Sequence, residues 1–248
     1  MRRRDCHART TARYAQPHRM KQELRILTPL GMLGYGIPEE PFWRGVARRP
    51  DAIVADSGST DPGPYQLGLG AMLVTREAYV RDLTLMLKAA FEHKIPLLIS
   101  SAGGPGIDQH VDDMIDIVRE LSAQHGYRFK VAAIYANVDR HIIHQRLDEG
   151  RITECGPSGE LTHEAIDAAT HIVAQMGAEP FLKVLTERPD IDIIISGRSY
   201  DPAPHAAVCM QHDIDPGVYW HMAKIVECGA ACAEPKGRVI LATIRRDS

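Results

Sequence analysis

The stretch IPLLISSAGGPG, residues 95–106, decides the fold. Its first six residues form a short apolar run that is typical of a buried strand, and the glycines after them are typical of a tight loop. Helices are predicted on both sides, over residues 75–93 and 108–124, because both segments carry apolar side chains at helical spacing. A buried strand between two amphipathic helices is the repeating unit of an α/β sheet.

The same alternation of strands and helices extends in both directions along the chain. Further strands are predicted over residues 25–33, 51–56, 130–138, 191–196 and 239–244. Further helices are predicted over residues 41–47, 139–147, 162–176, 179–186, 201–211 and 217–228. This pattern predicts an α/β fold: an open, mostly parallel, twisted sheet with helices on both faces, in a Rossmann-like three-layer arrangement. No repeat or linker divides residues 21–248, so we expect one domain there.

Composition excludes several classes of protein. The 248 residues are 44% hydrophobic and 25% charged, which is the mix of a folded globular chain. No apolar run approaches the roughly 20 residues of a membrane-spanning helix, so we expect no membrane partner. The five cysteines are odd in number and show no dense spacing, which argues against a disulfide scaffold and favours a cytoplasmic location.

Charge is distributed unevenly along the chain. Residues 1–19 carry six arginines and one acid, a net charge of +5, so the remainder carries −8 within a total of −3. We expect residues 1–20 to be a disordered arm, or to precede a natural start at Met20. A mildly acidic body does not favour a nucleic-acid partner, because phosphate backbones select clustered Lys and Arg.

Four glycine-rich segments follow predicted strands. They are GMLGYG at residues 31–36, DSGSTDPGP at 56–64, SSAGGPGID at 100–108 and SGRSYDP at 196–202. In an open α/β sheet such loops gather at the carboxyl ends of the strands, where ligands bind. The loops are predicted to form one pocket for an anionic small molecule. The alternative is that each is simply a tight turn that needs positive φ.

The candidate binding residues come from these loops and from the segment HMAKIVECGAACAEP at 221–235. Glycine amides and hydroxyls would cradle the anion, and Arg198 would contact it as a planar fork. Asp201 has a second reading as the N-cap of the helix that follows it. The predicted substrate-binding residues are Gly34, Gly36, Ser57, Ser59, Thr60, Gly103, Gly104, Arg198, Asp201 and Lys224.

The candidate catalytic residues are Asp56, His221 and Glu227, which could donate and accept protons. His221, Lys224 and Cys228 share one face of a predicted helix, although Cys228 has a second reading as a small buried side chain. The spacing of Cys228 and Cys232 is not that of a zinc ribbon, so no metal ligands are assigned. The carboxylates near residue 56 could also bind a divalent metal ion, so this alternative stays open.

One weaker alternative is a nicotinamide cofactor. The order of glycines in GMLGYG is G-x-x-G-x-G, which differs from the G-x-G-x-x-G of dinucleotide-binding loops. Asp56 nevertheless lies 20 residues after Gly36, where an acid that binds ribose would stand. No G-x-x-x-x-G-K-[ST] sequence occurs, so a P-loop ATPase is not supported.

Several long strings resemble one family. LTPLGMLGYGIPEEPFWRG, DSGSTDPGP, SAGGPG, VAQMGAEP, SGRSYDPAP and DPGVYWHMAKIVECGA, spread over residues 25–244, are similar to the acyclic terpene utilisation AtuA family. The resemblance implies a catabolic role inside the cell, on a branched or acyclic acyl-CoA, and carries over no residue roles. Family members usually start near the equivalent of Lys21 and continue past that of Ser248, so residues 21–248 resemble a family domain without its C-terminal portion.

These observations lead to one expected function and a rival. We expect an enzyme of hydratase, lyase or hydrolase type that acts on a branched or acyclic acyl-CoA or carboxylate. The rival is a non-catalytic ligand-binding or complex-forming subunit. No cofactor is assigned beyond the CoA part of a substrate. The expected partners are an anionic small molecule and either a second copy of the chain or a chain that carries the missing portion.

Overall fold

The computed structural model describes residues 21–59 and 63–245, so the expectations for residues 1–20 and for Thr60 lie outside the described part. The six strands are β1 Glu23–Thr28, β2 Ala52–Asp56, β3 Leu97–Ser100, β4 Val131–Ile134, β5 Ile193–Ser196 and β6 Ile240–Arg245. They form one sheet in the order β4-β5-β3-β2-β1-β6. Every pair is parallel except β1 with β6, which confirms the predicted mostly parallel sheet.

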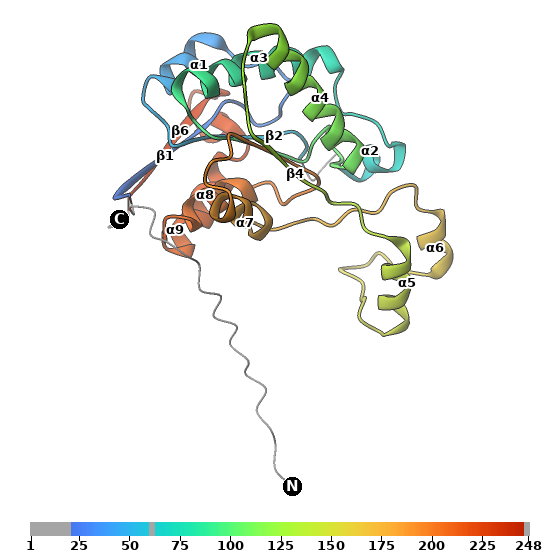
Figure 1. The fold of residues 1–248 in the computed structure, drawn as a ribbon. Coiled ribbons are helices and arrows are strands. Elements are labelled where there is room, and N and C mark those ends of the chain that lie inside the picture. The colour runs from blue at the N-terminus through green and yellow to red at the C-terminus, as the bar shows by residue number, and fades with distance from the viewer. Residues whose placement is uncertain (1–20, 60–62, 246–248) are drawn as a thin grey trace.

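Two layers of helices cover the sheet (Figure 1). The helices are α1 Glu39–Val46, α2 Gly63–Leu69, α3 Arg76–His93, α4 Asp108–His125, α5 Arg140–Asp148, α6 His163–Ala168, α7 Glu179–Glu187, α8 Ala203–Met210 and α9 Pro216–Val226. A 3₁₀ turn, Gly229–Cys232, follows α9. Helices α1, α3 and α4 lie on one face of the sheet, and α7, α8 and α9 lie on the other.

The core is aliphatic because successive strand residues point to opposite faces. Leu97 and Ile99 of β3 join the cluster under α3 and α4, whereas Leu98 joins the cluster under α7 and α8. All four residues of β3 are buried. A strand buried on both faces must be apolar throughout, which is why residues 95–100 show no alternation of polar and apolar side chains.

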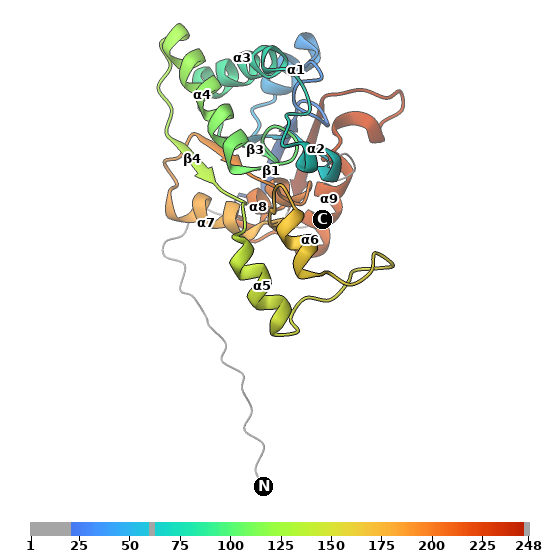
Figure 2. The same ribbon diagram turned by 90° about the vertical axis from the view of Figure 1, so that its right-hand side faces the viewer.

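Helices α5 and α6 project from the body of the molecule (Figures 1 and 2). The predicted helix over residues 162–176 was too long, since α6 ends at Ala168. The following backbone bonds to neighbouring loops instead: the Ala174 amide donates to the Ala136 carbonyl, and the Met176 amide donates to the Arg198 carbonyl. These bonds tie the base of the projection to the carboxyl ends of β4 and β5.

The remaining differences are small. Pro29 ends β1 earlier than expected, and α2 forms inside a segment that we expected to be loop throughout. None of the helices in the described ranges is both long and apolar enough to cross a membrane.

Candidate functional site

The site lies where the direction of chain crossover changes. β3 and β5 are neighbours, yet β3 continues into α4 on one face of the sheet, while β5 continues into α8 on the other. The loops after these two strands therefore diverge and leave room between them. In open α/β sheets this switch point is where ligands bind.

Arg198 lies at the centre of the switch point and is 5% exposed. Its Nη1 donates to the Gly104 carbonyl at 3.1 Å, and its Nη2 donates to the Gly58 carbonyl. Nη2 also bonds Oδ1 of Asp201 at 3.2 Å. The guanidinium thus joins the loops after β2, β3 and β5, so it organises the site, and its donors are largely occupied by the protein itself.

Glycines allow these loops to touch through their backbones. A Cβ on Gly58 would lie 2.0 Å from the Gly104 carbonyl oxygen, and one on Gly106 would lie 2.2 Å from the Arg198 amide nitrogen. Gly103, Gly104 and Gly106 also have positive φ. The glycines are therefore tight turns with positive φ, as the simpler interpretation predicts. They also let the loops after β2, β3 and β5 come into backbone contact at the switch point.

Asp56 ends β2 beside this loop cluster and is 1% exposed. Its Oδ1 accepts a 2.8 Å hydrogen bond from the Ser100 hydroxyl. Burial, reinforced by the nearby Asp201 carboxylate, raises the pKa of Asp56 to about 7, against the opposing effects of Arg198, Ser100 and the Gly58 amide. A carboxyl group that changes protonation near neutral pH is suited to acid–base chemistry.

Asp201 departs from its predicted role as a helix cap. Pro202 occupies the N-cap of α8, without a side-chain bond to the helix. The Asp201 side chain forms an ion pair with Arg198. It is 10% exposed, so it lies nearer to solvent than the fully buried Asp56 does. Asp56 and Asp201, called the carboxyl pair below, therefore lie near enough for the charge of Asp201 to act on Asp56, and Arg198 acts on both.

The segment after α9 reaches the same region. Lys224 forms an ion pair with the buried Glu227, and the bond to Glu227 raises the pKa of Lys224, with smaller contributions from Tyr200 and Asp201. Burial and then the charge of Glu227 raise the pKa of the Cys228 thiol, with smaller effects from Asp201 and Asp56. The structure thus brings Lys224 and Glu227 close to the carboxyl pair.

His221 lies elsewhere. It is exposed on α9 and lines a groove of about 620 Å³ against β6, together with Met222, Ile225 and Ile240. Although His221 and Lys224 are one turn apart, they line different parts of the molecule. His221 is therefore not brought together with Asp56.

Gly34 and Gly36 have an internal partner. Their amides donate to Oδ2 of the buried Asp82 at 2.8 and 3.0 Å, and the Ile37 amide donates to Oδ1 at 3.3 Å. An acid from α3 thus occupies the amides that we expected to hold a ligand anion. Arg81 bonds to the same carboxylate and to the Gly34 carbonyl.

The remaining predicted residues lie on the loop after β2. Ser57 is buried, and its amide donates to the Ser100 carbonyl at 2.9 Å. Ser59 is partly exposed and follows Gly58 towards α2. Within residues 21–59 and 63–245, no group of three or more His, Cys, Asp or Glu side chains could hold a metal ion.

Sequence reasoning missed Ser100, Asp82 and His205. Ser100 lies in one of the four glycine-rich segments, but the sequence predicts no role for it. Asp82 stands three residues after Tyr79 on the apolar face of a predicted helix, and a charge there is a recognisable signal. His205 is fully buried on α8, and its Nε2 lies 2.9 Å from the Thr28 hydroxyl. Burial lowers the pKa of His205 to about 3.

A family model matches the larger part of the chain. The family described as "Acyclic terpene utilisation family protein AtuA" matches over residues 76–236. This range includes the loops after β3 and β5 and the segment around Lys224 and Glu227. Searches of curated proteins and of solved structures found no match.

Proposed function

The chain belongs to the acyclic terpene utilisation AtuA family, and on that premise we propose that it is an enzyme that acts on a branched or acyclic acyl-CoA or carboxylate. Membership itself points to a role in acyclic terpene utilisation. The reaction we propose is acid–base chemistry of hydratase, lyase or hydrolase type, in the cytoplasm. The four cysteines of the described part are free thiols, which is compatible with a reducing compartment.

The carboxyl pair at the switch point carries this proposal. Asp56 has a pKa of about 7 because it is buried and because Asp201 lies nearby. Two neighbouring carboxyl groups in such an environment hold an extra proton near neutrality, which is the state from which a general acid acts. Asp201 is the more exposed member, so it would contact the substrate. Asp56 would hold the shared proton until it is transferred.

The other residues have supporting roles in the proposal. Lys224, whose side chain is 64% exposed, supplies the positive charge for a carboxylate or phosphate of the substrate. Glu227 holds Lys224 in place and is the third acid of the site. Arg198 fixes the loops, because its donors bond to carbonyl groups and to Asp201. His221 is left out of this set, since it lines the separate groove beside β6.

Binding and turnover test the proposal separately. Thermal shifts would be measured with CoA, isovaleryl-CoA and free isovalerate, followed by product analysis for the ligands that stabilise the chain. A ligand at about 100 times its dissociation constant stabilises by roughly 2.7 kcal/mol. Lys224→Met is expected to weaken binding, and Asp56→Asn is expected to leave binding intact and abolish turnover. The absence of any shift with all three ligands would contradict the proposed site.

The non-catalytic reading keeps one supporting observation, the nearly complete burial of Asp56. It predicts stabilisation by a ligand that is never consumed, and equal affinity of the wild type and of Asp56→Asn for that ligand. The nicotinamide reading has less support, because Asp82 already occupies the amides of Gly34 and Gly36.

A further inference from the structure

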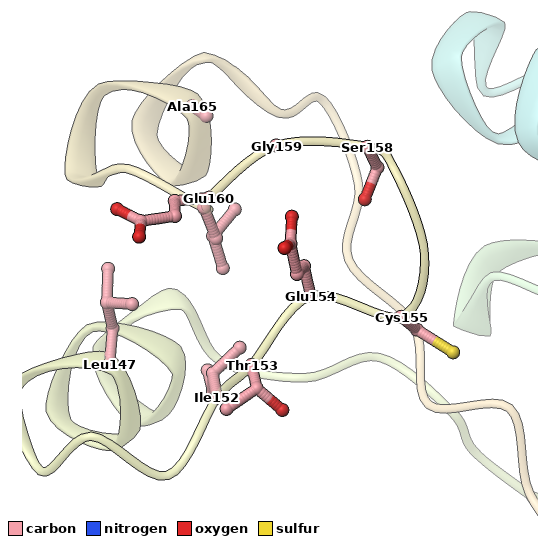
Figure 3. Close-up of a pocket in the computed structure, with 10 residues that line it drawn as sticks. Leu147, Ile152, Thr153, Glu154, Cys155, Ser158, Gly159, Glu160 and Ala165 are labelled. Atoms are coloured by element: carbon pink, nitrogen blue, oxygen red, sulfur yellow. The ribbon is translucent and has the colours of Figure 1, made fainter.

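Helices α5 and α6 hold together with little apolar packing. No residue of α5 is buried, and Ile166 is the buried residue of α6. Between the helices and their connecting loop lies a cavity of about 810 Å³. Figure 3 shows that Leu147 of α5, Ala165 of α6 and the carboxylates of Glu154 and Glu160 surround it. The association of α5 with α6 therefore depends mainly on polar contacts.

The principal polar contact joins two histidines. Nδ1 of His144 on α5 lies 2.6 Å from Nδ1 of His163 on α6. The ring centroids are 4.9 Å apart and the planes differ by 9°. Because the nitrogens are much closer than the centroids, the nearly parallel rings meet head-on at their Nδ1 atoms and do not lie face to face.

A carboxylate holds the opposite nitrogen of each ring. Nε2 of His144 lies 2.9 Å from Oδ1 of Asp167, and Nε2 of His163 lies 3.0 Å from Oδ1 of Asp148. An ionised carboxylate only accepts hydrogen bonds, so each Nε2 carries its hydrogen. If both rings were neutral, two Nδ1 lone pairs would face each other at 2.6 Å.

We propose that His144 and His163 share one proton between their Nδ1 atoms, and that this proton clasps α5 to α6 in a pH-dependent way. One ring is then an imidazolium that donates, and the other is a neutral imidazole that accepts. The charged groups beside the pair favour this state: Asp148 on α5, and Asp167 and Glu164 on α6, are all acids. Arg140 of α5 instead bonds to the Ala169 carbonyl.

The separation of the two nitrogens selects a proton over a metal ion. A tetrahedral zinc ion, with Zn–N bonds of about 2.0–2.1 Å, needs its two nitrogens about 3.3 Å apart. The observed 2.6 Å is shorter, and it is within reach of a charge-assisted N–H···N hydrogen bond. A metal ion would therefore require α5 and α6 to separate, whereas a proton fits as they stand.

Proton counting fixes the sign of the pH dependence. The clasped pair holds one shared proton. At high pH the open pair holds none, so closing requires proton uptake and weakens as pH rises. At low pH the open pair holds two, so closing requires proton release and weakens as pH falls. The clasp is therefore tightest at intermediate pH.

Nuclear magnetic resonance of the full chain tests this directly. A shared proton predicts a ¹⁵N–¹⁵N coupling between the two Nδ1 atoms across the hydrogen bond at intermediate pH. It also predicts amide protection factors in α5 and α6 that peak there and fall on both sides, by up to about fivefold for a partly exposed charged pair. His144→Gln should lower this protection and remove the peak. His141→Gln, on the same helix, should keep it.

Two results would overturn the proposal. One is the absence of the Nδ1–Nδ1 coupling throughout the titration, or a protection profile that His144→Gln leaves unchanged. The other is loss of the α5–α6 protection on addition of EDTA, which would show that a metal ion is the bridging cation.

Discussion

The Ser100 hydroxyl donates a 2.8 Å hydrogen bond to the buried carboxyl group of Asp56. These residues end β3 and β2 and are paired across the two strands. Their contact marks the carboxyl edge of the sheet as a place where ionisable groups are held away from water. The pH dependence of stability should reveal them.

Asp56→Asn should change how stability depends on pH. The folded chain keeps the Asp56 proton up to a pH of about 7, the pKa that burial and Asp201 produce, whereas the unfolded chain loses it near pH 4. Stability in the wild type therefore decreases through this group as pH rises from about 4 to about 7, by on the order of 4 kcal/mol. Urea unfolding of both proteins at several pH values measures the difference. A constant difference would show that Asp56 ionises normally.

His205→Gln should reveal the opposite slope. The folded chain holds His205 neutral down to a pH of about 3 because the ring is buried, whereas the unfolded chain takes up the proton near pH 6.5. This group therefore costs the wild type stability as pH falls from about 6.5 to about 3. Gln replaces Nε2 beside Thr28 and removes that loss, so the variant should resist acid better relative to its stability at pH 7. Equal acid sensitivity would contradict a buried neutral ring.

Gly58→Ala should destabilise the fold strongly. The new Cβ would lie 2.0 Å from the Gly104 carbonyl oxygen, so one of the two loops must move. We expect a loss of roughly 1–3 kcal/mol, together with loss of any ligand-induced thermal shift. Gly68→Ala is the matched control, because nothing lies within 4 Å of that position and it is inside α2. The control should be neutral or stabilising by up to about 1 kcal/mol.

Arg198→Met should cost about 3–5 kcal/mol, since it removes the buried ion pair with Asp201 and the hydrogen bonds to two buried carbonyl groups. The pKa of Asp56 should rise further, because Arg198 opposes that rise. Arg119→Met is the control: Arg119 forms an exposed ion pair with Asp116, and its loss should change stability by less than about 1 kcal/mol. Similar melting temperatures for the two variants would argue against the central role of Arg198.

Asp82→Asn should loosen the loop after β1. The carboxylate accepts bonds from three backbone amides and from Arg81. An amide side chain brings donors to face donors, so we expect a loss of about 2 kcal/mol or more in chemical denaturation. Asp116→Asn on the exposed side of α4 should have little effect. If the two substitutions cost the same, the amide contacts contribute little.

The fold could be predicted from the sequence because local signals and core burial agree. All six strands lie within or beside the predicted ranges. The signal is clearest for β2, β3 and β5, whose residues are all buried between the two helix layers, whereas β4 and β6 at the edges are only partly buried. The segment after Ala168 could not be read in this way. Its apolar residues have helical spacing, but the neighbouring loops after β4 and β5 offer its backbone other hydrogen-bond partners.

The sequence predicted the position of the candidate site residues better than their individual roles. Asp56, Arg198 and Asp201 do gather at the carboxyl edge, because parallel strands bring their following loops together. The sequence could not show that the donors of Arg198 would be occupied by hydrogen bonds to the carbonyl groups of Gly58 and Gly104, which are distant in sequence. Nor could helical spacing separate His221 from Lys224, because residues one turn apart can face different neighbours.

Asp82 gives the loop after β1 a resident counter-ion. A phosphate or carboxylate ligand would have to displace the Asp82 carboxylate from these amides. Because Asp82 is attached to α3, its effective concentration at the amides is higher than that of any dilute ligand. That corner of the sheet therefore acts as a fixed joint. In the function proposed above, the selection of a ligand therefore depends on the loops after β2, β3 and β5.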